Sequence, residues 1–273
     1  PRKVMPKGRL AAHACPVYPR RMEASAAAPF PLPRTLLFEL TQDCNHDCIH
    51  CYNVWKGIAP YPAGMLGTQA VCLLFDRLAR EEGISHVTLT GGEPLLREDL
   101  FHIVDHLRQL GIRLNLISNG SLLDAAVLER LRPNKIDLFE LPLLSDQRSI
   151  HDAMSGAPGA FDRVTRAIVE LKLRKQRAIA VFVATNRNLP RWRETLELAL
   201  ALGCDEVMLN RFNPGGRGLA HRRELEPPPA ALRQALDQAE AFSRRYGLGI
   251  SCGVPVPPCV LDTQSYEKLR FGR

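Results

Sequence analysis

The chain has 273 residues, of which 45% are hydrophobic and 24% are charged, and its formal net charge is +7. This length and composition indicate a globular protein with a sizeable core, and they exclude a short disulfide-stapled scaffold. No apolar run approaches the ~20 residues of a membrane span, and Ala24–Ala28 is too short for a signal core, so we expect a cytoplasmic protein with reduced cysteines.

Arginine and lysine side chains are spread along presumed helices, as in Arg163, Arg166, Lys172 and Arg174. This spread is typical of solvated helix faces, so nucleic acid is not an expected partner. A basic surface suits an acidic peptide or a nucleotide, but it does not distinguish between them.

Residues 1–33 are rich in proline, alanine and arginine and show no periodicity, which indicates an N-terminal arm or cover segment. From residue 35 onward, strand-like and helix-like segments alternate. The predicted strands are Thr35–Leu40, His86–Thr90, Ile112–Ile117, Ile136–Leu141, Ile179–Ala184 and Glu206–Asn210. The predicted helices are Thr68–Glu82, Glu98–Leu110, Asp124–Leu131, Ala160–Lys175, Pro190–Leu202 and Ala230–Tyr246, the first with Thr68 as its N-cap and Gly83 as its end.

Strands that alternate with helices predict a parallel sheet built from right-handed βα units. Six such pairs are fewer than a closed eightfold barrel needs. The sequence therefore predicts an α/β protein with a partial (β/α)6 barrel of the TIM type. We divide the chain into the arm (1–33), a core barrel (34–225), and a last helix with a short C-terminal extension (226–273).

Cys44, Cys48 and Cys51 follow the first predicted strand with the spacing Cys-x3-Cys-x2-Cys. Three thiolates can hold three irons of a 4Fe–4S cluster and leave the fourth iron open for a substrate or cofactor. The spacing also fits part of a zinc site with His46 or His50 as fourth ligand, or three packed thiols. On spacing alone, these alternatives stay open.

Further polar and glycine-rich segments follow later strands, where loops of such a fold carry the chemistry. Gly91-Gly92-Glu93-Pro94 lets a backbone approach a ligand and offers a carboxylate for an ammonium group. Ser118 and Asn119 suit the hydroxyls of a sugar. Pro214–Gly218 is either a flexible loop or a space for a ring or carboxylate. Each segment alone is an ordinary turn or loop, but their convergence on one rim favours a binding site.

With these motifs, the sequence over about residues 35–220 resembles the radical S-adenosylmethionine (radical SAM) superfamily. The family's cysteine motif maps onto Cys44, Cys48 and Cys51, and its Gly-Gly-Glu-Pro motif maps onto Gly91–Pro94. The resemblance implies a partial (β/α)6 barrel with a 4Fe–4S cluster and S-adenosylmethionine as cofactors. It also implies candidate cofactor-binding residues: Glu93 and nearby carbonyls for the ammonium group, Ser118 and Asn119 for the ribose, and Tyr52 near the adenine.

The chemistry that the resemblance implies is reductive cleavage of S-adenosylmethionine to a 5′-deoxyadenosyl radical, which abstracts hydrogen from a substrate. An external donor of the flavodoxin or ferredoxin type is the expected source of the electron. The expected substrate is a ribosomally made peptide. A small-molecule cofactor precursor is the alternative substrate, and a non-enzymatic zinc or iron–sulfur scaffold is the alternative role.

The stretch His151–Phe161 is similar to a segment of radical SAM enzymes that carry a SPASM or twitch extension. A Ser-Leu-Asp-Gly motif usually precedes it there, whereas this chain has Leu143-Leu144-Ser145-Asp146. We expect His151 and Asp152 to order the loop rather than to do chemistry.

The remaining cysteines divide into two groups. Cys252 and Cys259 resemble the opening of a SPASM region, where cysteines bind auxiliary clusters, but the further cysteines of such a region are absent. The pair is therefore a candidate auxiliary metal site in an incomplete extension. We expect Cys72 and Cys204 to be core thiols and Cys15 to be a lone thiol.

Overall fold

The computed structural model describes residues 34–56, 64–131, 135–255 and 262–271. These residues belong to one compact unit of the chain, Pro33–Arg273. The predicted arm with Cys15, and also Cys259, lie outside the described residues. None of the described helices is long and apolar enough to cross a bilayer.

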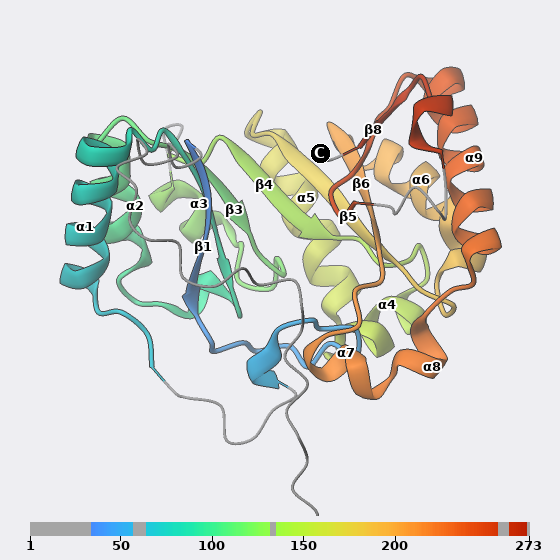
Figure 1. Ribbon diagram of the computed structural model, residues 1–273, viewed down its shortest axis with the longest axis horizontal. Helices are drawn as coiled ribbons and strands as arrows, with labels where there is room; N and C mark the ends of the chain where they lie inside the picture. Colours follow the sequence, from blue (N-terminus) through green and yellow to red (C-terminus); the bar gives the residue numbers. More distant parts are fainter. Residues whose placement is uncertain (1–33, 57–63, 132–134, 256–261, 272–273) are drawn as a thin grey trace, which may run out of the picture. The chain divides into compact units, whose positions relative to one another are not determined.

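Eight parallel strands form one open sheet, hydrogen-bonded in chain order from β1 to β8 (Figure 1). The strands are β1 (Thr35–Thr41), β2 (His86–Gly91), β3 (Arg113–Ile117), β4 (Leu138–Pro142), β5 (Ala178–Ala184), β6 (Glu206–Arg211), β7 (Gly249–Cys252) and β8 (Leu269–Phe271). The first six match the predicted strands closely, so the α/β partial barrel is confirmed. The sequence did not predict β7 and β8, because strands this short carry too few residues to show an alternating pattern.

Helices connect the strands along the chain. They are α1 (Thr68–Arg77), α2 (Leu100–Gln109), α3 (Ala125–Arg130), α4 (Arg148–Ser155), α5 (Ala160–Leu173), α6 (Trp192–Ala201), α7 (Gly216–Ala220), α8 (Arg222–Leu225) and α9 (Pro229–Tyr246). A π-helical turn continues α1 to Gly83, which ends it in the left-handed conformation with φ 66°, as predicted. Thr68 was predicted as the N-cap, but Gly67 is the cap and the Thr68 hydroxyl instead donates to Asp99 at 2.5 Å.

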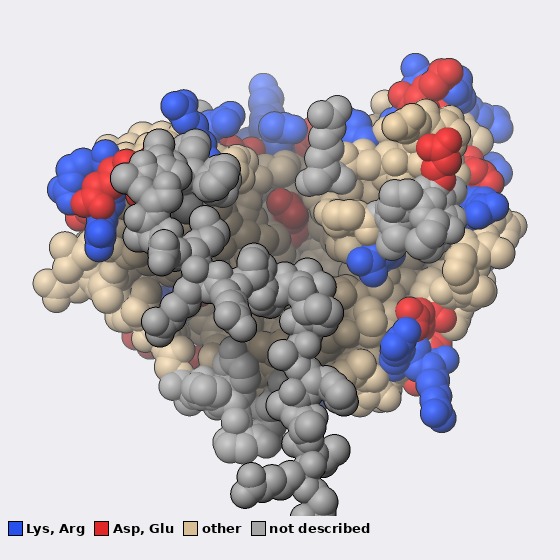
Figure 2. Space-filling view, viewed as in Figure 1, with Lys and Arg blue, Asp and Glu red and all other residues tan. Residues whose placement is uncertain are grey.

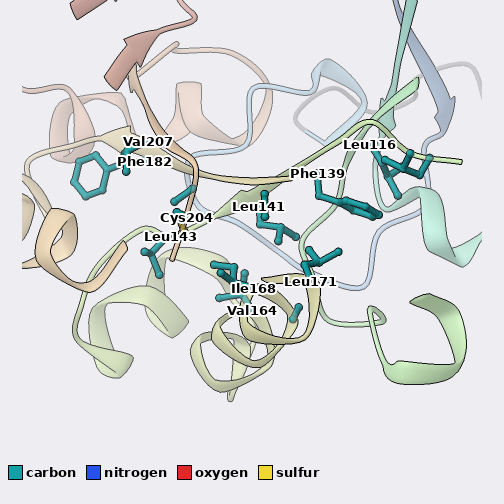
Figure 3. Close-up of a cluster of buried hydrophobic side chains, with 14 of the residues drawn as sticks. Leu116, Phe139, Leu141, Leu143, Val164, Ile168, Leu171, Phe182, Cys204 and Val207 are labelled. Carbon is teal, nitrogen blue, oxygen red and sulfur yellow. The ribbon is translucent and has the colours of Figure 1, made fainter. Parts of the chain in front are cut away.

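The two faces of the sheet have different roles because neighbouring residues of a strand point to opposite sides. On the outer face, Leu116, Phe139 and Leu141 are buried and pack with side chains of α5 such as Ile168 and Leu171 (Figure 3). On the inner face, residues such as Ile117 are only partly buried. The hydrophobic core therefore lies between the sheet and its helices. The inner face of the strands, here called the inner wall, lies outside this core.

Truncating Leu116 to alanine should remove a fully buried side chain from this core. We expect the free energy of unfolding to fall by about 2–5 kcal/mol, measured by urea denaturation. Leu173→Ala is the control, because Leu173 is 73% exposed at the end of α5. Equal losses in both variants would contradict this location of the core.

Candidate functional site

The cysteine loop (residues 42–53) leaves the carboxyl end of β1 and carries the three cysteines. Cys44, Cys48 and Cys51 are all half-buried free thiols. The Cys51 N–H donates to the Cys48 carbonyl at 3.2 Å, which folds the loop back on itself. Burial and the neighbouring Cys51 and Cys44 raise the pKa of the Cys48 thiol to about 12. Burial also raises the pKa of Cys51, so bare thiolates at Cys48 and Cys51 are costly and the loop suits a metal centre that takes up their charge.

The glycine turn (Gly91–Pro94) lies directly against the start of this loop. The Gly92 N–H donates to the Thr41 carbonyl at 2.7 Å, and the Glu93 N–H donates to the Asp43 carbonyl at 2.7 Å. A Cβ atom on Gly92 would lie 2.0 Å from the Asp43 carbonyl oxygen. Only glycine permits this approach, so the turn and the cysteine loop are brought together by their backbones.

Glu93 is fully buried, and its carboxylate accepts three hydrogen bonds from its own chain. The donors are Leu95 N–H at 3.1 Å, the Ser118 hydroxyl at 2.9 Å and Asn119 N–H at 2.7 Å. Burial raises the pKa of Glu93, while these hydrogen bonds oppose the rise. The carboxylate thus joins the loop after β2 to the loop after β3. The Gly91, Glu93 and Pro94 carbonyls each accept one hydrogen bond, from Asn53, Leu96 and Arg97 respectively. The Gly92 carbonyl is therefore the first candidate acceptor for an ammonium group.

The predicted ribose contacts lie beside Glu93. Ser118 is buried, and its hydroxyl also accepts Gly120 N–H at 3.0 Å. The Asn119 amide donates to Asn45 of the cysteine loop at 2.7 Å and accepts Ser121 N–H at 2.9 Å. Both side chains therefore hold the rim together.

Tyr52 and Pro94 complete the predicted set. Tyr52 is 49% exposed, and its backbone lies against Gly215, where a built Cβ would be 2.8 Å from the Tyr52 carbonyl oxygen. Burial and the charges of Glu39 and Cys51 raise the pKa of Tyr52. Pro94 is buried and begins a short 3-10 turn, Pro94–Leu96. The structure thus brings every predicted cluster and cofactor residue of the core to one end of the barrel.

Sequence reasoning missed a second support for the cysteine loop, at the end of α4. The Asp47 N–H donates to the Ser155 carbonyl at 3.1 Å, and the Ile49 N–H donates to the Met154 carbonyl at 3.0 Å. Gly156 ends α4 with φ 59°, and a Cβ there would lie 2.2 Å from the Asp47 carbonyl oxygen. This glycine therefore fits the middle of the loop against α4.

His151 and Asp152 order this support, as expected. The Asp152 carboxylate accepts N–H groups of Gly159 at 2.7 Å and Phe161 at 2.8 Å. The His151 Nδ1 atom accepts the Leu144 N–H at 3.2 Å. Where related enzymes have a Ser-Leu-Asp-Gly motif, Asp146 of this chain pairs with Arg191 at 2.5 Å, so its carboxylate serves the fold.

A third support comes from the glycines after β6. The alternative of a flexible loop was wrong, because Gly216 begins α7. The Gly218 N–H donates to the Cys51 carbonyl at 2.9 Å, and a Cβ on Gly216 would lie 2.1 Å from the Asn53 carbonyl oxygen. Arg217 forms an ion pair with Asp47. The spacing Gly-Gly-x-Gly was the available signal for close packing.

The charged and aromatic groups around the loop bear on the zinc alternative. The Lys56 ammonium donates to the His46 carbonyl at 2.5 Å, and its charge opposes the rise in the pKa of Cys48 and Cys51. Burial lowers the pKa of His46 and of His50 to about 4, so both rings are neutral. Within the described ranges, no three His, Cys, Asp or Glu side chains converge closely enough to hold one metal ion. Cluster ligands bind separate irons and need no such convergence.

Of the other cysteines, the structure describes Cys72, Cys204 and Cys252, and all three are buried. Cys252 is 2% exposed, belongs to the hydrophobic core, and has its pKa raised to about 12 by burial. Its candidate partner Cys259 lies outside the described residues, so the auxiliary site has no geometric support. Cys72 and Cys204 are buried, which confirms them as core thiols.

The chain belongs to the radical SAM superfamily, whose family model matches residues 38–199. It is 33% identical over 186 residues to an AdoMet-dependent heme synthase of Methanosarcina barkeri, a match that covers 68% of this chain and 52% of the relative. It is 30% identical over 223 residues to a PqqA peptide cyclase of Gluconobacter oxydans, covering 82% of this chain and 62% of the relative. The chain therefore spans only about half to two thirds of these relatives.

Solved structures share the fold. The structure of Streptococcus suis SuiB bound to the precursor peptide SuiA has a TM-score of 0.68 at 15% sequence identity, covering 81% of this chain and 49% of that chain. At this identity the likeness concerns the fold alone. The superfamily uses a 4Fe–4S cluster and S-adenosylmethionine, and the similarity to the peptide cyclase supports the predicted relation to SPASM and twitch enzymes.

Replacing Gly156 with alanine should displace the cysteine loop, because the new Cβ meets the Asp47 carbonyl. We expect the iron content after anaerobic reconstitution to fall severalfold. Gly247→Ala is the matched control: Gly247 has φ 70° and no atom within 4 Å of a built Cβ. It should lose about 1 kcal/mol of stability from backbone strain and keep its iron. Equal iron contents would contradict the role of Gly156.

The raised pKa of Glu93 predicts a pH dependence of stability. Native Glu93 keeps its proton to a higher pH than the unfolded chain does. The native state therefore binds more protons from about the ordinary value of 4.5 up to the raised pKa, and stability falls as the pH rises through that window. The stability of the wild type relative to Glu93→Gln should decline there. Urea denaturation at several pH values measures this difference in the free energy of unfolding. Glu82→Gln, at an exposed position, is the control.

Proposed function

We propose that this chain is the core of a radical SAM enzyme that modifies a ribosomally made peptide. The observation that carries the proposal is the backbone contact between the glycine turn and the cysteine loop, with Gly92 N–H and Glu93 N–H bonded to Thr41 and Asp43. It brings the three cysteines and the carbonyls of the turn to one rim. A metal centre and a cationic amino group next to it would then be held by neighbouring atoms.

Cys44, Cys48 and Cys51 would hold the cluster, and the carbonyls of the glycine turn would accept the ammonium group of S-adenosylmethionine. When bound there, the cluster and S-adenosylmethionine would supply one-electron reductive cleavage of the sulfonium and, through it, hydrogen-atom abstraction from the substrate. The Glu93 carboxylate holds the glycine turn next to Ser118 and Asn119 through its hydrogen bonds with both residues. Tyr52, exposed at the mouth, offers a ring for the adenine, and Ser118 and Asn119 form the wall near the ribose.

The remaining parts of the proposal concern partners. An external flavodoxin-type or ferredoxin-type donor would supply the electron in the cytoplasm. A peptide is the preferred substrate because a similar curated relative is named a peptide cyclase and a structural neighbour is bound to a precursor peptide. A small-molecule precursor is the second candidate, favoured by the heme synthase relative. Residues 34–225 would be the catalytic core, with 226–273 extending the same sheet through β7 and β8.

Cys48→Ala should abolish both the brown cluster and 5′-deoxyadenosine formation, because it removes one ligand from the centre of the loop. Product is measured by chromatography after anaerobic reconstitution and addition of reductant and S-adenosylmethionine. Cys72→Ala, a core thiol on α1, should keep both signals. If the wild type with a fully loaded cluster forms no 5′-deoxyadenosine, the proposal that the chain is an enzyme is contradicted. About one equivalent of zinc and no iron after anaerobic purification would favour the scaffold.

A further inference from the structure

The inner wall of the barrel is a partly exposed surface opposite to the core. Inner positions in the middle strands include Ile117, Pro142, Val181 and Val183, and all of them are only partly buried. Their outer-face neighbours in the strands, such as Leu116, are fully buried. Figure 2 shows this side as a hollow with acidic atoms on its floor. The wall thus carries apolar side chains next to polar ones such as Asn115 and Glu140, and it is partly open to solvent.

Glu140 is the charged group in the middle of this wall. It pairs in register with Ile117 of β3 and Ile179 of β5, and it lies two residues, or ~7 Å, below the carboxyl end of β4. Burial and the charge of Glu206 raise the pKa of Glu140, and only a hydrogen bond with Asn115 opposes the rise. No ion pair of Glu140 occurs within the described ranges. A carboxylate in such surroundings is costly without a counterion.

None of the neighbouring charges discussed below compensates the carboxylate of Glu140. Glu206, on the same inner face of β6, forms an ion pair with Arg270 of β8, so its charge is already compensated. Arg113 lies at the amino end of β3, away from the mouth. One polar atom of the wall lacks a partner in the part of the chain that the structure describes: the Ser251 hydroxyl of β7 is buried without a hydrogen bond. The wall therefore offers acceptors below the rim where the cofactors would lie.

We propose that Glu140 anchors the substrate by binding a lysine or arginine side chain of the peptide inside the barrel. The carboxylate would form charge-assisted hydrogen bonds with the cation, and the apolar side chains beside it, Ile117 and Val181, would pack against the aliphatic stem. A polyanionic substrate such as a nucleotide would instead meet an uncompensated like charge. This inference rests on the proposed function and adds the chemical class of the substrate.

The test is a binding selection with reconstituted holoenzyme and S-adenosylmethionine against a displayed library of short random peptides. Wild type should enrich peptides with Lys or Arg over those with Asp or Glu. Glu140→Gln should reduce this preference about tenfold, the value of one charge-assisted hydrogen bond. Glu140→Lys should reverse it. Glu82→Lys makes the same change of charge on the exposed end of the π-helical turn and should keep the wild-type preference.

An unselective or acid-preferring wild type overturns the proposal, and so does a Glu140→Lys variant that keeps the wild-type preference. Circular dichroism and iron content report the folding of each variant. If Glu140→Lys does not fold, the isosteric Glu140→Gln variant decides. Release of 5′-deoxyadenosine by the wild type is measured in parallel. Its absence from a loaded cluster defeats the proposed function, whereas its presence with an unselective library defeats only the role of Glu140.

Discussion

The site depends on the close approach of glycines to the backbone of the cysteine loop. Gly92 meets the loop at Asp43, Gly156 meets it at Asp47, and Gly216 meets it at Asn53, each where an added Cβ would lie about 2 Å from a carbonyl oxygen. The contacts come from three different parts of the barrel, so the loop is fixed at its start, middle and end. A loop held by its backbone leaves its cysteine side chains available for a metal centre.

The same arrangement explains why a carboxylate is buried beside the site. Glu93 must lose its hydration to sit between the loops after β2 and β3, and its three hydrogen bonds offset part of that cost. Its position then fixes Asn119, which reaches Asn45 of the cysteine loop. One buried acid thereby connects the glycine turn, the polar loop and the cysteines, although the sequence motif alone suggests that it faces a ligand.

Much of this was visible in the sequence. The first six strands could be predicted because each carries an apolar residue at every second position. The cysteine and glycine motifs could be predicted because their residue types are unusual. The supports at Gly156 and Gly216 could not be predicted, since a sequence does not say which backbone a glycine will pack against. Strands β7 and β8 are too short to show periodicity. Thr68 lost its capping role because Asp99, distant in sequence, accepts its hydroxyl.

Because side chains alternate along each strand, the residues that stabilise the sheet and the residues that could contact a substrate lie on opposite faces. Outer positions such as Leu116, Leu141 and Phe182 are fully buried under helices and set the stability of the sheet. Inner positions such as Glu140 and Val181 contribute little to that core, so they can vary with the substrate without unfolding the barrel. The rim is constrained by glycine contacts and the outer face by packing. The inner wall is therefore where members of one fold can differ, and a carboxylate without an ion pair, such as Glu140, would match the charge of what the barrel accepts.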